Sequence, residues 1–363
     1  MTMKITALYV YPIKGLRGIE LETAQIRPQG ISHDRTFMLY EVRPPGDKLE
    51  KIQLDTHPRC ALFEQQIVPK SQAGDEAAAL VVRFRGVPGT GETDESVRET
   101  LRVPLEPDMA ALEKIDIRLH DSPAAAYRMG DACDAWFSRR FGVPAMMVYL
   151  GDGRRSVLGK SLVPRAAAEQ QQQQQQRGWM TSLTSYITGA APSSDTNSPA
   201  PWLTFTDVAP LLVTSEPSRQ DVSERLLGGQ AVEMYKFRPN IVVDGEGEDA
   251  WAEDFWAELE VETQTREPEA PRKQTLQLTG NCVRCLSLNV DYRTGKPAEG
   301  EQGNVLKRLM KDRRVDPGSK WSPVFGRYAF PDSHAEGFTV SVGDGVEVSR
   351  RNAERTVFDW PNM

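Results

Sequence analysis

The chain has 363 residues, a formal net charge of −7 and four cysteines. A chain of this length buries a sizeable core and is expected to form two domains, or one large intertwined domain, at roughly 150 residues each. The acidic balance argues against a general nucleic-acid-binding protein, because such proteins carry a basic footprint. Few cysteines without obvious pairing indicate a reducing compartment rather than a secreted disulfide scaffold.

The first predicted element is a strand over residues 5–10, an apolar run that ends at Tyr11-Pro12. A chain that opens on a strand leaves no room for a signal peptide, a transit peptide or a membrane span. We therefore expect a soluble, cytoplasmic protein without a membrane span.

Short strand-like runs then continue to about residue 103, among them residues 19–26 and 35–40, separated by Gly, Pro and Asp turns. This pattern predicts a β-rich barrel or sandwich. One helix is predicted over residues 130–141, with Asp131 as its N-cap. Its apolar face comprises Cys133, Trp136, Phe137 and Phe141.

Residues 165–201 differ in composition from the rest of the chain. They contain an unbroken glutamine run at 170–176 and a stretch dense in Ser, Pro, Thr and Asn at 190–201. Such a segment buries too little apolar surface to offset the entropy lost on ordering, so a disordered insertion is predicted. A partner-docking segment is the alternative, because Trp179 and Tyr186 are apolar.

After the insertion the pattern predicts strands at 210–214 and 241–243, and a helix at 218–227 capped by Ser218. A hairpin over 276–290 and a terminal strand pair over 337–348 follow. The expected organisation is an N-terminal β-rich region with one helix (1–164), the insertion (165–201), a second domain (202–354) and a C-terminal tail (355–363).

Cys282 and Cys285 are the most informative residues of the sequence. A closed structural zinc site needs four ligands, and neither Cys60 nor Cys133 has a ligand partner at suitable spacing. One thiolate is enough, however, to hold a soft metal whose other ligands come from an organic cofactor. A thioredoxin-type redox pair fits less well, because the residues after Cys285 alternate like a strand. An inert buried pair is the remaining alternative.

Three basic residues, Lys14, Arg35 and Arg238, each lie beside Gly or Pro at the edge of a strand-like run. Together they would suit a phosphate, which guanidinium groups contact in a bidentate manner. Asn240 offers both a donor and an acceptor for the edge of a heterocycle. Taken singly, each fits an ordinary solvated, ion-paired or turn residue.

Taken in order, these clusters resemble the MOSC-domain proteins, in particular the mitochondrial amidoxime-reducing component and its bacterial relatives. The resemblance runs from residue 5 to about residue 350, and its motifs are residues 11–15, 34–35, 206–207, 237–241, 252–256, 282–285 and 289–295. It implies an α+β protein with a β-barrel-centred MOSC fold, preceded by a β-rich N-terminal MOSC region.

The resemblance also implies the molybdenum cofactor, a molybdenum ion held by the dithiolene sulfurs of a pyranopterin phosphate. In the family pattern Cys285 is the metal ligand and catalytic residue, and an exchange of roles with Cys282 stays open. The positions that match cofactor-binding residues are Lys14, Gly15, Arg35, Asp207, Val208, Ala209, Arg238, Asn240, Val283 and Arg284. Gly15, Val208, Ala209 and Val283 lack the hydroxyl groups of animal members, and Asp55 replaces an arginine.

The implied activity is reduction of small N-hydroxylated substrates such as amidoximes, by oxygen abstraction at the Cys-ligated molybdenum. No dinucleotide, flavin or iron–sulfur motif is visible, so an external electron donor is expected, either a reductase or a b-type cytochrome. The alternative is a carrier of the cofactor or a sulfur-transfer protein without substrate turnover. Cofactor sulfurases of the family carry a pyridoxal-phosphate domain upstream, and this chain is expected to start too late to include one. A third alternative is an interaction module that has lost the cofactor.

Overall fold

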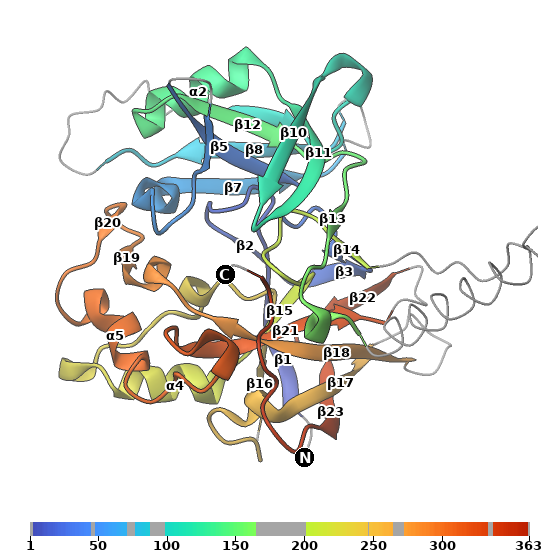
Figure 1. Cartoon of the computed structure of the whole chain (residues 1–363), viewed down its shortest axis with the longest axis vertical. Coiled ribbons are helices and arrows are strands. Elements are labelled where there is room, and N and C mark those ends of the chain that lie inside the picture. Colours follow the sequence, from blue (N-terminus) through green and yellow to red (C-terminus); the bar gives the residue numbers. More distant parts are fainter. Residues whose placement is uncertain are drawn as a thin grey trace, which may run out of the picture.

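We analysed a computed structural model of the chain. It describes residues 3–44, 48–70, 77–87, 99–164, 201–245, 247–263, 272–332 and 337–361. The predicted insertion at 165–201 lies outside the described residues, except for Pro201. The described parts form two stacked β-rich halves, with the N-terminal half above a barrel in Figure 1.

Seven strands close into the barrel, in the order β16-β15-β21-β18-β17-β23-β1, with β1 pairing back onto β16. They are β1 (Met3–Val10), β15 (Leu211–Ser215), β16 (Ile241–Asp244), β17 (Trp256–Thr263), β18 (Arg272–Val283), β21 (Val324–Pro331) and β23 (Gly345–Arg351). Ile5, Leu8 and Val10 of β1 point into the barrel core, and an irregularity between Ile5 and Ala7 shifts the alternation by one residue. The barrel prediction is thus confirmed, and its first strand comes from the start of the chain.

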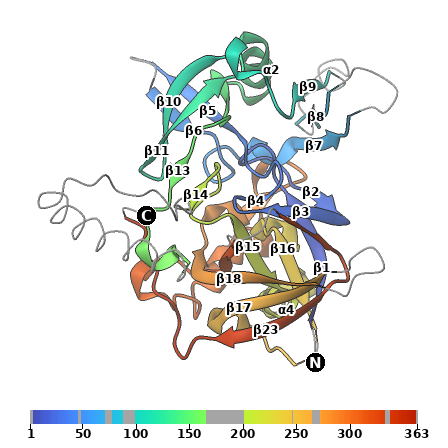
Figure 2. The same ribbon diagram turned by 90° about the vertical axis from the view of Figure 1, so that its right-hand side faces the viewer.

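Strand β1 is central to the architecture because it has three partners. Its residues 4–8 pair with β16, whereas its other edge pairs with β23 at Met3 and Lys4 and with β2 (Ile19–Leu21) at residues 8–10. Figure 2 shows β1 running along the barrel towards the N-terminal half. The segment that follows β1 therefore starts at the junction of the two halves.

The N-terminal half consists mainly of two antiparallel sheets and helix α2 (Asp131–Phe141). The five-stranded sheet contains β5 (Phe37–Arg43), β6 (Lys48–Lys51), β10 (Glu113–Leu119), β11 (Ser122–Arg128) and β12 (Ala145–Tyr149). The three-stranded sheet contains β7 (Phe63–Val68), β8 (Ala79–Phe84) and β9 (Leu101–Pro104). Helix α2 buries the predicted apolar face against both sheets, and its aromatic rings stack on Phe63.

Smaller elements connect the two halves and cover the barrel. A third sheet joins β3 (Thr23–Arg27) and β4 (Gly30–Ile31) to β22 (Phe338–Ser341), and short pairs form from β13 (Arg155–Ser156) with β14 (Trp202–Leu203) and from β19 (Val290–Asp291) with β20 (Lys296–Pro297). Helices α4 (Glu216–Glu224) and α5 (Val305–Leu309) pack on the outside of the barrel. Among the described helices, none is long and apolar enough to cross a bilayer.

Two predicted caps are wrong. Gly130, not Asp131, is the N-cap of α2, and the Asp131 carboxylate pairs with Arg128 at 2.6 Å. Helix α4 begins earlier than predicted, after Ser215, so Ser218 lies inside its first turn. Its hydroxyl donates to Glu253 at 2.8 Å and accepts the backbone N–H of Trp251 at 2.7 Å. In a sequence, a serine that forms hydrogen bonds with a neighbouring element cannot be distinguished from a serine that caps a helix.

The predicted cysteine hairpin over 276–290 is also wrong. Strand β18 runs to Val283 and pairs with β17 and β21, and residues 286–289 form the 3₁₀ turn η7 (Leu286–Asn289) instead of a returning strand. The backbone N–H of Arg284 donates to the carbonyl of Pro323 at 2.8 Å, which fixes the exit from the strand. Likewise, the two terminal strands do not pair with each other, since β22 joins β3 and β23 joins β17 and β1.

Candidate functional site

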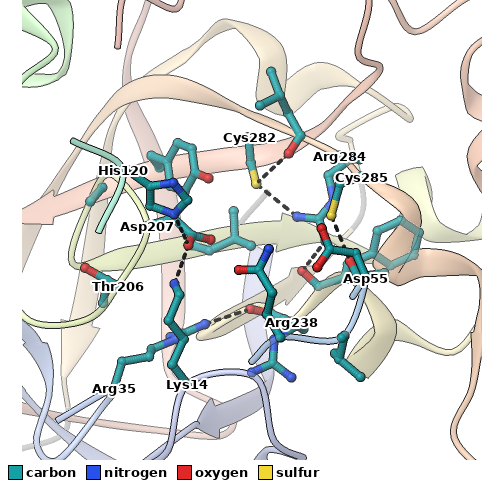
Figure 3. Close-up of a pocket in the computed structure, with 18 of the residues that line it drawn as sticks. Lys14, Arg35, Asp55, His120, Thr206, Asp207, Arg238, Cys282, Arg284 and Cys285 are labelled. Atoms are coloured by element: carbon teal, nitrogen blue, oxygen red, sulfur yellow. Dashed lines mark hydrogen bonds and ion pairs between the residues drawn. The ribbon is translucent and has the colours of Figure 1, made fainter. Parts of the chain in front are cut away.

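A cavity of about 330 Å³ lies where loops of the N-terminal half meet the barrel. Figure 3 shows basic side chains on one side of it and the two cysteines on another. The predicted site residues that line it are Lys14, Gly15, Arg35, Asp207, Ala209, Arg238, Asn240, Val283, Arg284 and Cys285. Val208 is not among the lining residues, because its side chain is fully buried in an apolar cluster.

The two cysteines differ sharply in their surroundings. Cys282 is 4% exposed, and its sulfur accepts a hydrogen bond from Nη1 of Arg284 at 2.9 Å. Cys285 is exposed, and its sulfur lies 3.2 Å from the hydroxyl of Ser287. The guanidinium of Arg284 thus points towards Cys282, and its Nη2 donates to the carbonyl of Phe237 at 2.7 Å. Both cysteines line the cavity, and Cys285 is the more exposed of the two.

Arg35 and Arg238 form the basic side of the cavity, and both have a strained backbone. Their φ angles are +48° and +57°, a region that non-glycine residues seldom occupy. Their guanidinium carbons each lie 4.3 Å from the centroid of the Tyr11 ring, and Arg35 Nη2 donates to the carbonyl of Arg238 at 3.3 Å. Strain of this kind persists only where the surrounding structure enforces it.

Asp34 and Asn240 hold this pair in place. The Asp34 carboxylate is 1% exposed, pairs with Arg35, and accepts from the backbone N–H of Tyr11 at 2.8 Å and from Nδ2 of Asn240 at 3.1 Å. Asn240 Nδ2 also donates to Tyr9, and its Oδ1 accepts from Leu212 N and Arg35 Nη1. All four hydrogen-bonding positions of the amide are thus used. Asn240 orients Arg35 and has no free position for a heterocycle edge.

Lys14, Asp207 and His120 form a second polar cluster on the cavity wall. The Lys14 ammonium is buried and pairs with Oδ1 of Asp207, which also lies 3.1 Å from Nε2 of His120. Burial lowers the pKa of Lys14 to about 8, although Asp207 acts against this shift. Burial alone would raise the pKa of Asp207. The charge of Lys14 and the hydrogen bond from His120 have a larger effect and hold the pKa of Asp207 well below its usual value.

Sequence reasoning missed His120 and left Asp55 without a role. His120 and Asp121 are the two central residues of the β10–β11 turn, and both have positive φ, which such tight hairpin turns require. The turn brings His120 from the N-terminal half into the cavity, and Asp55 reaches it from the loop after β6. Tight turns of this kind are recognised in a sequence by glycine or asparagine. The dipeptide His120-Asp121 contains neither, so the turn could not be predicted.

The residues present fit an anionic organic cofactor with a soft metal. Arg238 and Arg284 have no carboxylate partner within the described ranges, so two cationic charges face the cavity uncompensated. Three buried polar atoms of lining residues also lack a partner there: Asp55 Oδ1, Thr206 Oγ1 and Arg284 Nε. Gly15 allows the turn after Lys14 to pack closely on the next loop, since its φ is +90° and a Cβ there would lie 3.2 Å from the carbonyl oxygen of Ile52. No group of three or more metal-ligating side chains occurs in the described part of the chain.

Comparison with known proteins gives two matches to domain families. Residues 2–144 match the MOSC N-terminal beta barrel domain, and residues 200–347 match the MOSC domain. Human mitochondrial amidoxime-reducing component 1 is 32% identical over 152 residues, which cover 41% of this chain and 39% of that protein. The molybdenum cofactor sulfurase of Botryotinia fuckeliana is 23% identical over 372 residues, which cover 95% of this chain and 41% of that protein.

The human molybdenum cofactor sulfurase is similar over 86% of this chain, at 23% identity, but over only 29% of its own length. The chain thus spans about two-fifths or less of the length of these relatives. The two domain matches nevertheless cover most of the chain, and they fall on the two halves seen in the structure. Because the chain matches both the MOSC N-terminal beta barrel domain and the MOSC domain, it belongs to the MOSC-domain proteins, a family with a molybdenum-cofactor-associated function.

Proposed function

We propose that this protein is a molybdenum-cofactor-dependent oxidoreductase that reduces small N-hydroxylated compounds. The observation that carries the proposal is the single cavity that contains an accessible thiol, Cys285, and two uncompensated guanidinium groups, Arg238 and Arg284. A thiolate suits a soft metal, and fixed guanidinium groups suit a phosphate. Relatives named amidoxime-reducing component support the same activity.

In this proposal Cys285 is the protein ligand of the metal, and Arg238 with Arg284 binds the anionic part of the cofactor. Lys14 and Arg35 neutralise Asp207 and Asp34, so they set the local charge more than they bind an anion directly. At Gly15, Val208, Ala209 and Val283, only backbone groups are available for contacts that hydroxyl groups make in related chains, whereas Asp207 offers its backbone beside a carboxylate paired with Lys14. When bound, the cofactor would supply a metal centre that accepts the hydroxyl oxygen of the substrate.

The overall reaction converts N–OH to N–H and releases water, and it consumes two electrons and two protons. The electrons come from an external donor, which we propose to be a reductase or a b-type cytochrome. Protein residues provide orientation and electrostatics, while the cofactor carries the redox chemistry. Among the titratable groups of the cavity wall, we assign proton supply to His120, which is hydrogen-bonded to Asp207.

A carrier or sulfur-transfer role is the second candidate. Relatives named molybdenum cofactor sulfurase align over 80–95% of this chain, far more than the 41% aligned with amidoxime-reducing component 1. Cys282, whose sulfur accepts a hydrogen bond from Arg284, would then be a second functional thiol. In that case the cofactor would bind and leave without any substrate being reduced.

The decisive test combines metal analysis with an activity assay on the purified protein. We expect stoichiometric molybdenum and pterin by mass spectrometry, together with reduction of an amidoxime when an artificial electron donor is supplied. Bound cofactor that exchanges readily, with no reduction under any donor, would favour the carrier. Absence of both molybdenum and pterin from protein expressed with an intact cofactor pathway would exclude both roles.

A further inference from the structure

The last described residues of the chain, 352–361, form a C-terminal strap without regular secondary structure, which runs along the barrel towards the N-terminal half (Figure 1). Side chains of the barrel hold its backbone. The Asn281 amide donates to the carbonyl of Thr356 at 2.9 Å, and the Asp316 carboxylate accepts the backbone N–H of Phe358 at 3.0 Å. Asn281 and Asp316 are both buried, and they are hydrogen-bonded to each other at 2.8 Å. The strap is therefore fixed to the barrel as far as Phe358.

Two aromatic side chains of the C-terminal strap belong to the packing of the cavity wall. Phe358 and Trp360 are each 3% exposed, and they share one apolar cluster with Ala209, Cys282 and Tyr328. Those three residues also line the cavity. The end of the chain is thus part of the packed unit that forms one wall of the site.

Beyond this packing, Trp360 makes a hydrogen bond to the N-terminal half. Its indole Nε1–H donates to the carbonyl oxygen of His120 at 2.9 Å and so joins residues 240 positions apart. The φ angles of His120 and Asp121, +50° and +61°, lie in a region that non-glycine residues seldom occupy. A strained turn keeps its conformation only where its surroundings enforce it. Trp360 supplies such a contact on the backbone side of the β10–β11 turn.

The imidazole of His120 is held by Asp207, with 3.1 Å between Nε2 and Oδ1. Arg155 also ties the two segments together, because its Nη2 donates to the carbonyls of Leu119 at 3.1 Å and Asp207 at 3.3 Å. Arg155 therefore restrains the turn at Leu119, one residue before the histidine, whereas Trp360 restrains it at His120 itself. Without the indole N–H, the His120 backbone loses this donor and the imidazole can move away from Asp207.

We propose that Trp360 is a positioning residue, which holds His120 in the cavity and against Asp207 through the backbone of the β10–β11 turn. Trp360 does not line the cavity, so it acts through His120 and not by contact with a cofactor or substrate. The proposal rests on the proposed function only for the role of His120 as the proton source. The placement of His120 does not depend on any reaction.

The test follows the His120 imidazole by NMR on the full chain with isotope-labelled histidine, and His120→Gln assigns the signal. Burial lowers the pKa of His120 from its ordinary value of 6.5, Asp207 opposes this shift, and Lys14 and Lys51 add to it. Trp360→Phe keeps an aromatic ring in the cluster and removes the N–H donor. We expect the His120 titration midpoint to rise towards 6.5 in this variant, because the released imidazole regains water.

Trp136→Phe is the matched control. Trp136 is 4% exposed, close to the 3% of Trp360, and its indole N–H has no hydrogen-bond partner among the described residues. This variant should leave the His120 midpoint and kcat as in the wild type. In amidoxime assays, Trp360→Phe should lower kcat by roughly fivefold, the effect of losing one neutral hydrogen bond, and leave bound molybdenum unchanged.

Asp359→Ala loosens the C-terminal strap in a second way, should Trp360→Phe fail to fold. Asp359 is exposed, and its carboxylate accepts from the backbone N–H of Ser161 at 2.9 Å and from the Ser161 hydroxyl at 2.7 Å. We expect a smaller rise of the His120 midpoint than in Trp360→Phe. Removal of a negative charge would by itself lower the pKa of His120, so a rise reports the release of the turn.

An unchanged His120 midpoint in folded Trp360→Phe, or in Asp359→Ala if only that variant folds, would overturn the proposal. An equal shift in Trp136→Phe would do the same, as would a loss of kcat without any shift. A midpoint that rises while kcat stays constant would support the placement of His120 and remove it as the proton source. If the wild type reduces no N-hydroxylated compound, the proposed function fails, and the NMR titration still decides the role of Trp360.

Discussion

Cys285 and Cys282 are three residues apart and both line the cavity, but only Cys285 is exposed. Because Cys285 is exposed and Cys282 accepts a hydrogen bond from Arg284, we predict that substituting the two cysteines has unequal effects on activity and on bound metal. Cys285→Ser should abolish reductase activity and reduce bound molybdenum, since an alkoxide is a harder and poorer ligand for this metal. Activity assays and metal analysis on the same preparations measure both effects.

Cys282→Ser provides the internal control. A serine hydroxyl can still accept the hydrogen bond from Arg284, so the loss should be smaller than for Cys285→Ser, with most molybdenum retained. Equal losses of metal in the two variants would make the assignment of the ligand unsafe.

Lys14 predicts a pH dependence of anion binding. Its pKa of about 8 means that the ammonium is charged below pH 8 and neutral above it. Above that pH the Asp207 charge is no longer balanced by Lys14 and repels an anion. Calorimetry with inorganic phosphate should show affinity falling as pH rises through about 8, whereas Lys14→Arg should extend binding to higher pH, because a guanidinium stays charged. A flat profile across that range in the wild type would contradict the assignment.

At the level of single residues, the family resemblance predicted the lining of the cavity better than its electrostatics. Nine of the ten predicted cofactor-binding positions line it, and Val208 does not. Nothing near Asn240 in the sequence indicates that its amide is fully hydrogen-bonded, because its partners come from distant parts of the chain: Tyr9, Asp34, Leu212 and Arg35. A sequence motif indicates which residue types line a site. Which of these side chains can bind a ligand depends on their hydrogen bonds and ion pairs, which form only in the folded structure.

Among the elements, the 3₁₀ turn η6 (Ala252–Phe255) carries an unusual buried acid. Glu253 is fully buried against α4, with Oε2 accepting from Ser218 and Oε1 unpartnered. Burial raises its pKa to about 7, against an ordinary value of 4.5. The favourable contribution of the protonated acid is complete below about pH 4.5 and is lost as pH rises through about 7.

Glu253→Gln should therefore stabilise the protein above pH 7, because the amide cannot ionise and its oxygen can still accept from Ser218. The gain should be near zero at pH 4.5, grow as pH rises towards 7, and level off above pH 7 at about 3 kcal/mol. Urea unfolding of both proteins between pH 4.5 and 8.5 measures the difference. A gain that is independent of pH would show that the carboxyl does not titrate in this way.

Periodic elements could be predicted from the sequence, and the element with the cysteines could not. The apolar spacing in residues 130–141 predicts a helix and the apolar run in residues 5–10 predicts a strand, and both elements form as expected. After Cys285 the apolar residues Leu286 and Leu288 alternate in the same way, but they belong to a 3₁₀ turn. A run of four residues cannot distinguish a strand from a turn that a distant backbone contact stabilises.

For the whole molecule, barrel closure makes the two ends of the chain interdependent. Strand β1 fills the gap between β16 and β23, so a fragment of residues 202–363 would expose two unpaired strand edges. We expect this fragment alone to lack a cooperative urea transition and a native near-UV circular dichroism spectrum. Co-expression with residues 1–164 should restore both.

The same co-expression with Ile5→Asp and Leu8→Asp in the N-terminal fragment should fail, because both side chains point into the barrel core. A cooperative transition of residues 202–363 on their own would disprove the dependence on β1. The closure itself could not be predicted from the sequence, since pairing of β1 with β16 joins residues more than 230 positions apart. The two-domain division and the cytoplasmic location inferred from the sequence stay predictions.

Gly15 joins the two sides of the cavity through the backbone alone. The turn that carries Lys14 lies against the carbonyl of Ile52 and the Cα of Gln53, with no side chain between them to absorb a displacement. A side chain at position 15 would therefore press on the backbone of the loop after β6. Substituting this glycine would force the two segments apart at the very place where the halves of the molecule share a wall.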